Sequence, residues 1–280
     1  MHKHTYFDLL LHDDAELSSI LNCAVVQRTT LHEWPLSCVQ RIYCEDGQTY
    51  IYKVQSPPTV EPAFYENARS PLLVSAQVIA DNALIMEDIR APHLNEVALS
   101  DAAKLAAVDN IVRQISQIEG DLPSVADLRT ESAWVAYVET IVSDIDMLIE
   151  EGKFQQVTQS MGDTLKKHAD SSAVMNSFSG EMGLVHGDLL GENVLVTSDG
   201  YRVIDWQRPI FGPTALDRST LLASVGLDPV PVVGPGILQL RRLLLIAWLA
   251  QAARYWFPEG ADHYDGQIAQ LLRELDASAT

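Results

Sequence analysis

The sequence predicts an α+β protein of two lobes, a small antiparallel β lobe followed by a larger, mainly helical lobe. Three observations lead to this prediction. β-rich runs flank turn residues in the first third of the chain, helical periodicity dominates after Asp88, and a short β-hairpin pattern interrupts the helical part near residue 200. We therefore place the two lobes at residues 1–88 and 89–280.

The first lobe is expected to contain two hairpins with a short helix between them. Asp46-Gly47 and Asp81-Asn82 are turn residues between runs of β-forming residues. The four strands are expected at residues 39–44, 49–54, 74–80 and 83–87. The helix is expected over residues 60–68, where Thr59 can serve as the N-cap and Pro62 is tolerated in the first turn.

The second lobe is expected to be helical around a small β island. Apolar residues repeat with a period of 3.6 in its long segments. Helices are expected at residues 105–118, 134–148, 155–168, 171–178, 237–257 and 267–275. The β island consists of a strand at 183–186 and a hairpin of 193–196 with 201–204.

Composition and charge exclude several classes of protein. The chain has 280 residues, of which 47% are hydrophobic, and its formal net charge of −19 repels nucleic acid and anionic membrane surfaces. No apolar run reaches the length of a membrane span, and the N-terminal residues lack the apolar core of a signal peptide. The three cysteines form no CxxC pair. We expect free thiols in a cytoplasmic protein that contacts neither nucleic acid nor membrane.

The chemistry is expected in residues 184–207, LVHGDLLGENVLVTSDGYRVIDWQ. Asp188 and Asn193 lie five residues apart on one loop, and Asp205 follows the hairpin pattern. Phosphoryl transfer requires a carboxylate near the attacking hydroxyl and oxygen ligands for Mg²⁺. The spacing H-x-D-x-x-x-x-N, followed by a hairpin and Ile-Asp, therefore favours Mg²⁺-assisted phosphoryl transfer.

This segment resembles the HGDxxxxN loop and the IDW motif of the aminoglycoside phosphotransferase and choline kinase-like family, which shares the protein-kinase fold. The resemblance spans roughly residues 20 to 220. Gly187 stands where protein kinases usually carry Arg, which favours the small-molecule branch. The resemblance implies a small-molecule kinase that uses ATP or GTP. It also implies that Asp188 is the catalytic carboxylate and that Asn193 and Asp205 bind Mg²⁺. It also implies structural roles for two other residues, His186 and Asp217.

The resemblance assigns nucleotide-binding residues to the first lobe as well. Lys53 matches the lysine that contacts the α- and β-phosphates, although an ordinary exposed strand lysine is the alternative. Its expected partner is a helix glutamate, either Glu61 or, as the second choice, Glu66. The run Leu84–Ile89 resembles the connector that binds adenine through its backbone. Its residues assigned to the nucleotide are Met86, Glu87 and Ile89.

The nucleotide lid and the acceptor are less well defined by the sequence. Residues 28–39, RTTLHEWPLSCV, contain no glycine, so a glycine-rich phosphate lid is not expected. The acceptor is expected to be a small molecule with a hydroxyl group. The net charge and the face shared by Glu139, Asp146 and Glu150 suggest a cationic acceptor, although a solvated helix face is the alternative. A nucleotide-binding pseudokinase is the alternative to an active kinase.

Overall fold

The computed structural model describes residues 1–277 and divides into two compact units. The first unit contains residues 1–98, 117–123 and 191–208, and the second contains 99–116, 124–190 and the residues from 209 onward. The hairpin near residue 200 thus groups with the N-terminal residues. The predicted lobe boundary at residue 88 stays a prediction, because the contacts divide the chain at several places rather than one.

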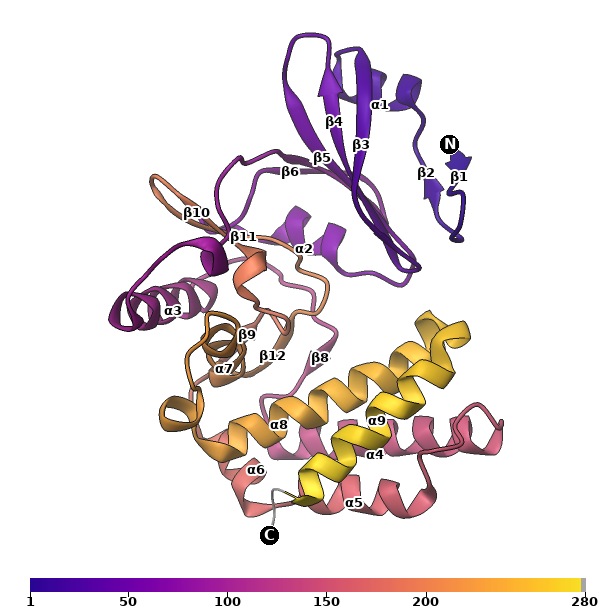
Figure 1. Cartoon of the computed structure of the whole chain (residues 1–280), viewed down its shortest axis with the longest axis vertical. Coiled ribbons are helices and arrows are strands. Elements are labelled where there is room, and N and C mark those ends of the chain that lie inside the picture. The colour runs from indigo at the N-terminus through magenta and orange to yellow at the C-terminus, as the bar shows by residue number, and fades with distance from the viewer. Residues whose placement is uncertain (278–280) are drawn as a thin grey trace. The chain divides into compact units, whose positions relative to one another are not determined.

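The first unit is built on an antiparallel sheet with the strand order β3-β4-β5-β7-β6 (Figure 1). Its strands are β3 (Val25–Trp34), β4 (Ser37–Cys44), β5 (Thr49–Gln55), β6 (Ala76–Ala80) and β7 (Ala83–Glu87). Both predicted hairpins are present, β4 with β5 and β6 with β7. Helix α2 (Glu61–Asn67) lies between β5 and β6 in the chain, as predicted. Its N-cap is Val60 rather than Thr59, and no side chain caps it.

Helix α1 and strand β3, near the start of the first unit, were not predicted. Helix α1 (Asp14–Leu21) begins with a capping box, in which Asp13 accepts the N–H of Glu16 and the Glu16 side chain accepts the N–H of Asp13. Strand β3 continues through residues 28–34, in the segment for which no glycine-rich lid was expected. It turns into β4 at Pro35-Leu36, so the turn between these strands is short and contains no glycine.

Further short elements complete the first unit. A small ladder joins β1 (His2–Lys3) to β2 (Leu10–Leu11), and a 3₁₀ turn spans Leu94–Glu96. After the 3₁₀ turn Gly191–Asn193, the predicted hairpin is formed by β10 (Val194–Thr197) and β11 (Gly200–Val203). The chain between β7 and residue 95 lies against this hairpin, because the Val196 N–H donates to the Pro92 carbonyl at 2.9 Å and His93 pairs with Leu195.

The second unit is mainly helical. Its helices are α3 (Asp101–Ile115), α4 (Glu131–Glu150), α5 (Gln159–Ala169), α6 (Ser172–Asn176), α7 (Ala215–Ser224), α8 (Val230–Gln251) and α9 (Ala261–Ala277). A 3₁₀ turn at Ser177–Ser179 follows α6, a π-helical turn at Ala252–Trp256 continues α8, and a 3₁₀ turn at Pro258–Gly260 precedes α9. A small sheet pairs β12 (Ile210–Pro213) with β8 (Ala126–Asp127) and with the predicted β9 (Met182–Val185).

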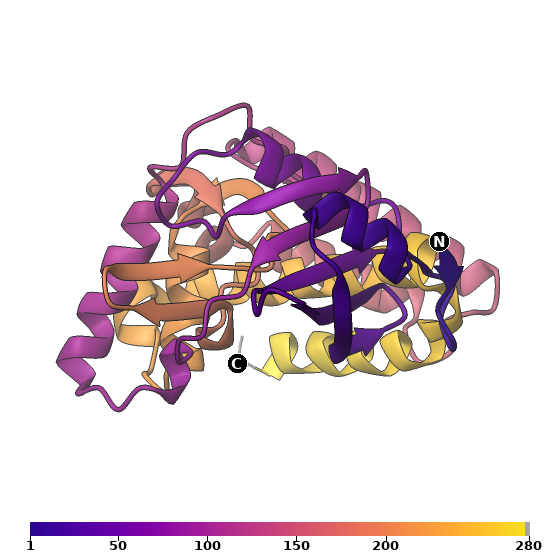
Figure 2. The same ribbon diagram turned by 90° about the horizontal axis from the view of Figure 1, so that it is seen from above.

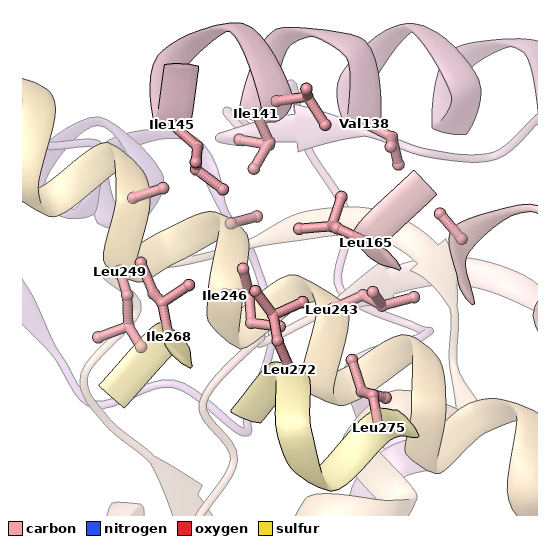
Figure 3. Packing of buried hydrophobic residues seen from close by; sticks show 14 of the residues in the cluster. Val138, Ile141, Ile145, Leu165, Leu243, Ile246, Leu249, Ile268, Leu272 and Leu275 are labelled. Atoms are coloured by element: carbon pink, nitrogen blue, oxygen red, sulfur yellow. The ribbon is translucent and has the colours of Figure 1, made fainter. Parts of the chain in front are cut away.

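The core of the second unit lies between its long helices (Figure 3). Ile141 and Ile145 of α4 face Leu243 and Ile246 of α8, and Leu272 of α9 joins the same cluster. Burial of each such side chain contributes about 1.5–3 kcal/mol to folding. Helices α8 and α9 contact one another and lie side by side in both ribbon views (Figure 1, Figure 2).

Helix α8 contains a kink and an unusually apolar stretch. Gly234 has non-helical angles (φ 76°, ψ 167°), and Pro235 begins the straight part, as the breaker-rich sequence before residue 237 predicts. By length and composition the segment Val230–Trp256 could cross a membrane, but core helices pass the same test. Its apolar residues Leu240, Leu243 and Ile246 are at most 3% exposed and belong to the core.

Candidate active site

Lys53 is a buried cation in the middle of the β5 strand. It pairs in register with Val39 of β4 and Leu84 of β7, and only 4% of its surface is exposed. Its Nζ lies 2.6 Å from Glu61 Oε2 and 2.5 Å from Asp205 Oδ1. Lysine is almost never buried this deeply unless it is paired. The contacts therefore exclude the alternative of an ordinary exposed strand lysine.

The carboxylates of Glu61 and Asp205 compensate for the free-energy cost of burying the Lys53 ammonium. Burial lowers the pKa of Lys53, but the carboxylates of Asp205 and Glu61 outweigh burial and hold the pKa above its ordinary value. Glu61 is fully buried, whereas the Asp205 side chain is 32% exposed. Lys53 therefore stays charged at neutral pH and is the main counter-ion of the buried Glu61.

Glu61, not Glu66, is the helix glutamate that pairs with Lys53. Glu61 opens α2 and is buried, while Glu66 lies on the exposed side of the same helix. The second carboxylate oxygen of Glu61 accepts the backbone N–H of Trp206 at 3.1 Å. The Phe64 ring of α2 stacks on the Trp206 indole with 4.3 Å between ring centroids. Helix α2 and the residues after β11 are thus joined by a hydrogen bond and by aromatic packing.

The β10–β11 hairpin places Asn193 and Asp205 at its open end. Val194 pairs with Val203 in the last register position, and the Ile204 N–H donates to the Asn193 carbonyl at 3.0 Å. Asp205 has φ 70°, in the left-handed region that a non-glycine residue rarely adopts. Such a conformation costs about 1–3 kcal/mol and is concentrated at functional sites. Amide and carboxylate oxygens at this position are the hard ligands that Mg²⁺ prefers.

The segment expected to bind adenine follows strand β7. Met86 is buried, Ile89 is half-buried, and the Glu87 side chain is exposed. The Glu87 N–H donates to the Ser75 carbonyl and the Glu87 carboxylate accepts the Ser75 N–H, each at 2.9 Å. Adenine recognition in this segment would therefore have to use backbone groups other than the Glu87 N–H.

Asp188 belongs to the second unit, in the loop that follows β9. Asp217 of α7 holds this loop, because its carboxylate accepts the N–H of His186 at 2.6 Å and the N–H of Gly187 at 3.1 Å. Gly187 has φ 84°, a conformation that glycine adopts without strain. His186 is fully buried, and its Nδ1 accepts the Asp188 N–H at 3.3 Å. These contacts support structural roles for Asp217 and His186.

The electrostatic surroundings of Asp188 include one group that sequence reasoning missed. Burial raises the pKa of Asp217 to about 7, although its two backbone hydrogen bonds oppose this shift. Arg241 of α8 has its pKa lowered, first by burial and second by Arg242, while Asp188 opposes that shift. The Arg241 guanidinium thus interacts electrostatically with Asp188. No sequence motif predicts this interaction.

A comparison with models of protein families shows which family this chain belongs to. The model of the phosphotransferase enzyme family (APH) matches residues 49–275. The chain belongs to this family. The match begins at strand β5, which carries Lys53, and extends into α9, beyond the end of the resemblance expected from the sequence.

Solved structures show the same fold as this member of the family. The apoenzyme of the macrolide 2'-phosphotransferase MphH from Brachybacterium faecium is 13% identical, with a TM-score of 0.57, 91% of this chain and 95% of that chain being covered. The streptomycin–ATP–APH(2")-IIa ternary complex is 19% identical, with a TM-score of 0.58 and coverage of 94% and 97%. The ethanolamine kinase of Plasmodium vivax is 13% identical, with a TM-score of 0.56 and coverage of 88% and 82%. A search of curated proteins found no significant match.

The acidic residues on helix α4 differ in their exposure to solvent. Glu139 and Glu150 are exposed and Asp146 is half-buried, so this face meets solvent in the second unit. Asp144 is different, because it is 3% exposed and its Oδ1 accepts the Tyr255 hydroxyl at 2.5 Å. The seven-residue and four-residue spacings predicted the shared face of Glu139, Asp146 and Glu150 correctly.

Proposed function

We propose that this phosphotransferase moves the γ-phosphoryl group of ATP or GTP to a hydroxyl group of a small molecule, with Mg²⁺ as the metal ion. The observation that carries the proposal is the position of Lys53 between Glu61 and Asp205 in a member of this family. Phosphoryl transfer depends on positioned cations and on a carboxylate that orients the attacking hydroxyl. Since the nucleotide comes from the cytoplasm, we propose that compartment as its location.

Nucleotide binding is assigned to the first unit. Lys53 is fixed by its two carboxylate partners and donates to the phosphates. The residues Met86, Glu87 and Ile89 contact the adenine or guanine base. The short β3–β4 turn supplies no glycine-rich backbone cradle, so the charge of Lys53 carries a large share of the phosphate affinity.

The metal ion is assigned to Asn193 and Asp205. Both residues offer oxygen donors at the open end of one hairpin, and the Asp205 carboxylate already accepts a cation, the Lys53 ammonium. This donor set suits Mg²⁺, which takes few protein ligands and keeps phosphate oxygens and water. Bound Mg²⁺ would neutralise the charge that develops on the transferred phosphoryl group.

The acceptor hydroxyl is assigned to Asp188. Its carboxylate accepts a hydrogen bond from the hydroxyl and takes its proton as the new oxygen–phosphorus bond forms. The bond from the γ-phosphorus to the bridging oxygen breaks, and the nucleoside diphosphate leaves. Asp217 positions Asp188 by holding the two backbone N–H groups that precede it.

The first prediction concerns nucleotide binding. Mg²⁺ with ATP or GTP should stabilise the folded chain, because a ligand that binds only the folded state stabilises it by about 2.7 kcal/mol at 100 times its Kd. That stabilisation raises Tm by several degrees for a chain of this size. Differential scanning fluorimetry with millimolar nucleotide measures the shift. An unchanged Tm with both nucleotides would contradict the proposal.

An acceptor with a cationic group is our proposal for the substrate class. The net charge of −19 enriches cations near the protein, and Glu139, Asp146 and Glu150 add local negative potential along one face of α4. The names of two structural neighbours include an amine-bearing ligand or substrate, streptomycin in one and ethanolamine in the other. Salt tests the proposal, because the reach of exposed charges shrinks from about 30 Å at 0.01 M to about 8 Å at 0.15 M ionic strength.

The second prediction is therefore a salt dependence of kcat/KM. For a cationic acceptor, kcat/KM should fall as ionic strength rises, and the combined change Glu139→Gln, Asp146→Asn and Glu150→Gln should flatten this dependence. A control variant removes three exposed acids of the first unit, Glu66→Gln, Asp81→Asn and Asp121→Asn. An equal flattening in both variants would refute a role for the α4 face. A salt-independent rate would refute the cationic acceptor and leave phosphotransfer intact.

A further inference from the structure

Two of the three cysteines meet at one end of the first unit's sheet. Cys44 is the last residue of β4 and is buried, and Cys23 lies between α1 and β3. Asp46 lies two residues after Cys44, in the turn that leads to β5. One ligand atom from each of these three side chains lies within 4.8 Å of the other two. We call these three residues the Cys23 cluster.

Backbone hydrogen bonds fix the segments that carry the Cys23 cluster. The Cys23 N–H donates to the Ser18 carbonyl of α1 at 3.2 Å, and the Glu45 N–H donates to the Ala24 carbonyl at 2.9 Å. On the hairpin side, the Cys44 N–H donates to the Gln48 carbonyl at 2.9 Å. The backbone therefore brings the three side chains close together. Their proximity does not depend on side-chain rotamers alone.

The chemistry of the cluster suits a thiophilic cation. Tetrahedral Zn²⁺ with bonds of about 2.3 Å to sulfur places its ligand atoms about 3.8 Å apart, and the three ligand atoms of the cluster all lie within 4.8 Å of one another. Burial raises the pKa of the Cys44 thiol to about 11, with the Cys23 side chain adding to the shift. At neutral pH Cys44 is therefore protonated without a cation, and a bound cation must displace its proton.

We propose that Cys23, Cys44 and Asp46 bind a thiophilic divalent cation such as Zn²⁺, at residues other than the Mg²⁺ ligands. The cation would bind two thiolate sulfurs and one carboxylate oxygen, release the two thiol protons to solvent, and keep one position for water. It would cross-link the end of α1 to the β4–β5 hairpin. The proposal does not depend on the proposed function, since it uses none of the residues assigned to phosphotransfer.

A second group of similar composition in residues 1–277 is a poor cation site. His4, Glu33 and Cys38 also bring three ligand atoms within 4.8 Å of one another. The His4 Nδ1, however, accepts the N–H groups of Tyr6 and Phe7, each at 3.2 Å, so the ring proton lies on Nε2, which faces Glu33 at 3.1 Å. Metal binding at Nε2 would move that proton to Nδ1, against two backbone donors. Cys38 therefore provides a matched control.

The experiment is a titration of the reduced full-length chain with Co²⁺, read from the thiolate-to-cobalt charge-transfer absorption in the near ultraviolet. We expect a saturable signal with one Co²⁺ per chain that Zn²⁺ displaces. Cys23→Ser and Cys44→Ser should abolish the signal, Asp46→Asn should weaken Co²⁺ binding about tenfold or more, and Cys38→Ser should leave it unchanged. The Co²⁺ affinity should rise with pH, because a bound cation must displace the proton of the Cys44 thiol.

Folding of each variant is checked by its melting curve, and Zn²⁺ should raise the Tm of the wild-type chain but not that of Cys23→Ser. Cys23 is only half-buried, so this variant tests the proposal even if Cys44→Ser does not fold. Lack of a charge-transfer signal in the folded, reduced wild-type chain would overturn the proposal. A signal that persists in folded Cys23→Ser, or that is lost in folded Cys38→Ser, would also overturn it.

Discussion

Asp188→Asn is expected to lower kcat by about 10²–10⁴-fold, because general-base catalysis by a positioned side chain contributes about that much. Asparagine keeps the size of the side chain but cannot take the proton of the acceptor hydroxyl. The Kd for the nucleotide should change little, since Asp188 is assigned to the acceptor. Steady-state kinetics and nucleotide titration of the same variant measure both quantities.

Asp205→Asn is the matched control, with the same change of carboxylate to amide. It should weaken nucleotide binding in the presence of Mg²⁺, because one metal ligand loses its charge and the Lys53 ammonium loses a partner. The assigned roles are distinguished by which parameter changes, kcat for Asp188 and nucleotide affinity for Asp205. If both variants changed the nucleotide Kd equally, the assignment of Asp188 to the acceptor would be wrong.

Lys53→Met is expected to destabilise the protein by about 3–5 kcal/mol, the usual cost of removing one partner of a buried ion pair. Methionine fills much of the same volume, but it leaves the fully buried Glu61 without its counter-ion. Nucleotide affinity should fall in the same variant, because Lys53 is assigned to the phosphates. Urea unfolding of the free protein gives the free energy of unfolding without interference from a ligand.

The double variant Lys53→Met with Glu61→Leu separates the charge effect from packing. It removes both buried charges, so it should recover a large part of the lost free energy of unfolding while nucleotide binding stays impaired. Asp205 retains solvent contact and can be hydrated in both variants. A double variant no more stable than Lys53→Met would show that packing around Lys53, rather than the uncompensated Glu61 charge, causes the loss.

Sequence reasoning predicted the two central hairpins, α2 and the long helices because their signals are local. An Asp-Gly turn marks one hairpin, and a 3.6-residue apolar period marks the helices. Helix α1 was missed although its capping box, Asp13 with Glu16, is visible in the sequence. Strand β12 was missed because it is short and ends in Gly212-Pro213, residues that usually indicate a turn.

The partner of Lys53 could not be fixed from spacing alone. Glu61 and Glu66 lie on the same short helix, and the choice depends on which face of α2 is buried against the rest of the unit. The contact of Trp206 with Glu61 joins residues 145 positions apart, and no local sequence pattern predicts it. Asp188, Asn193 and Asp205 were marked by their motif, whereas the approach of Lys53 to Asp205 depends on tertiary structure.

The net charge of Lys53 and its two carboxylate partners affects the order in which the metal ion and the nucleotide would bind. One ammonium faces two carboxylates, so this trio carries one net negative charge within a chain whose formal charge is −19. A bare triphosphate approaching it meets repulsion both at long range and at contact. Under the proposed function, the divalent ion would therefore bind together with the nucleotide, and metal-free ATP would be a weak competitor.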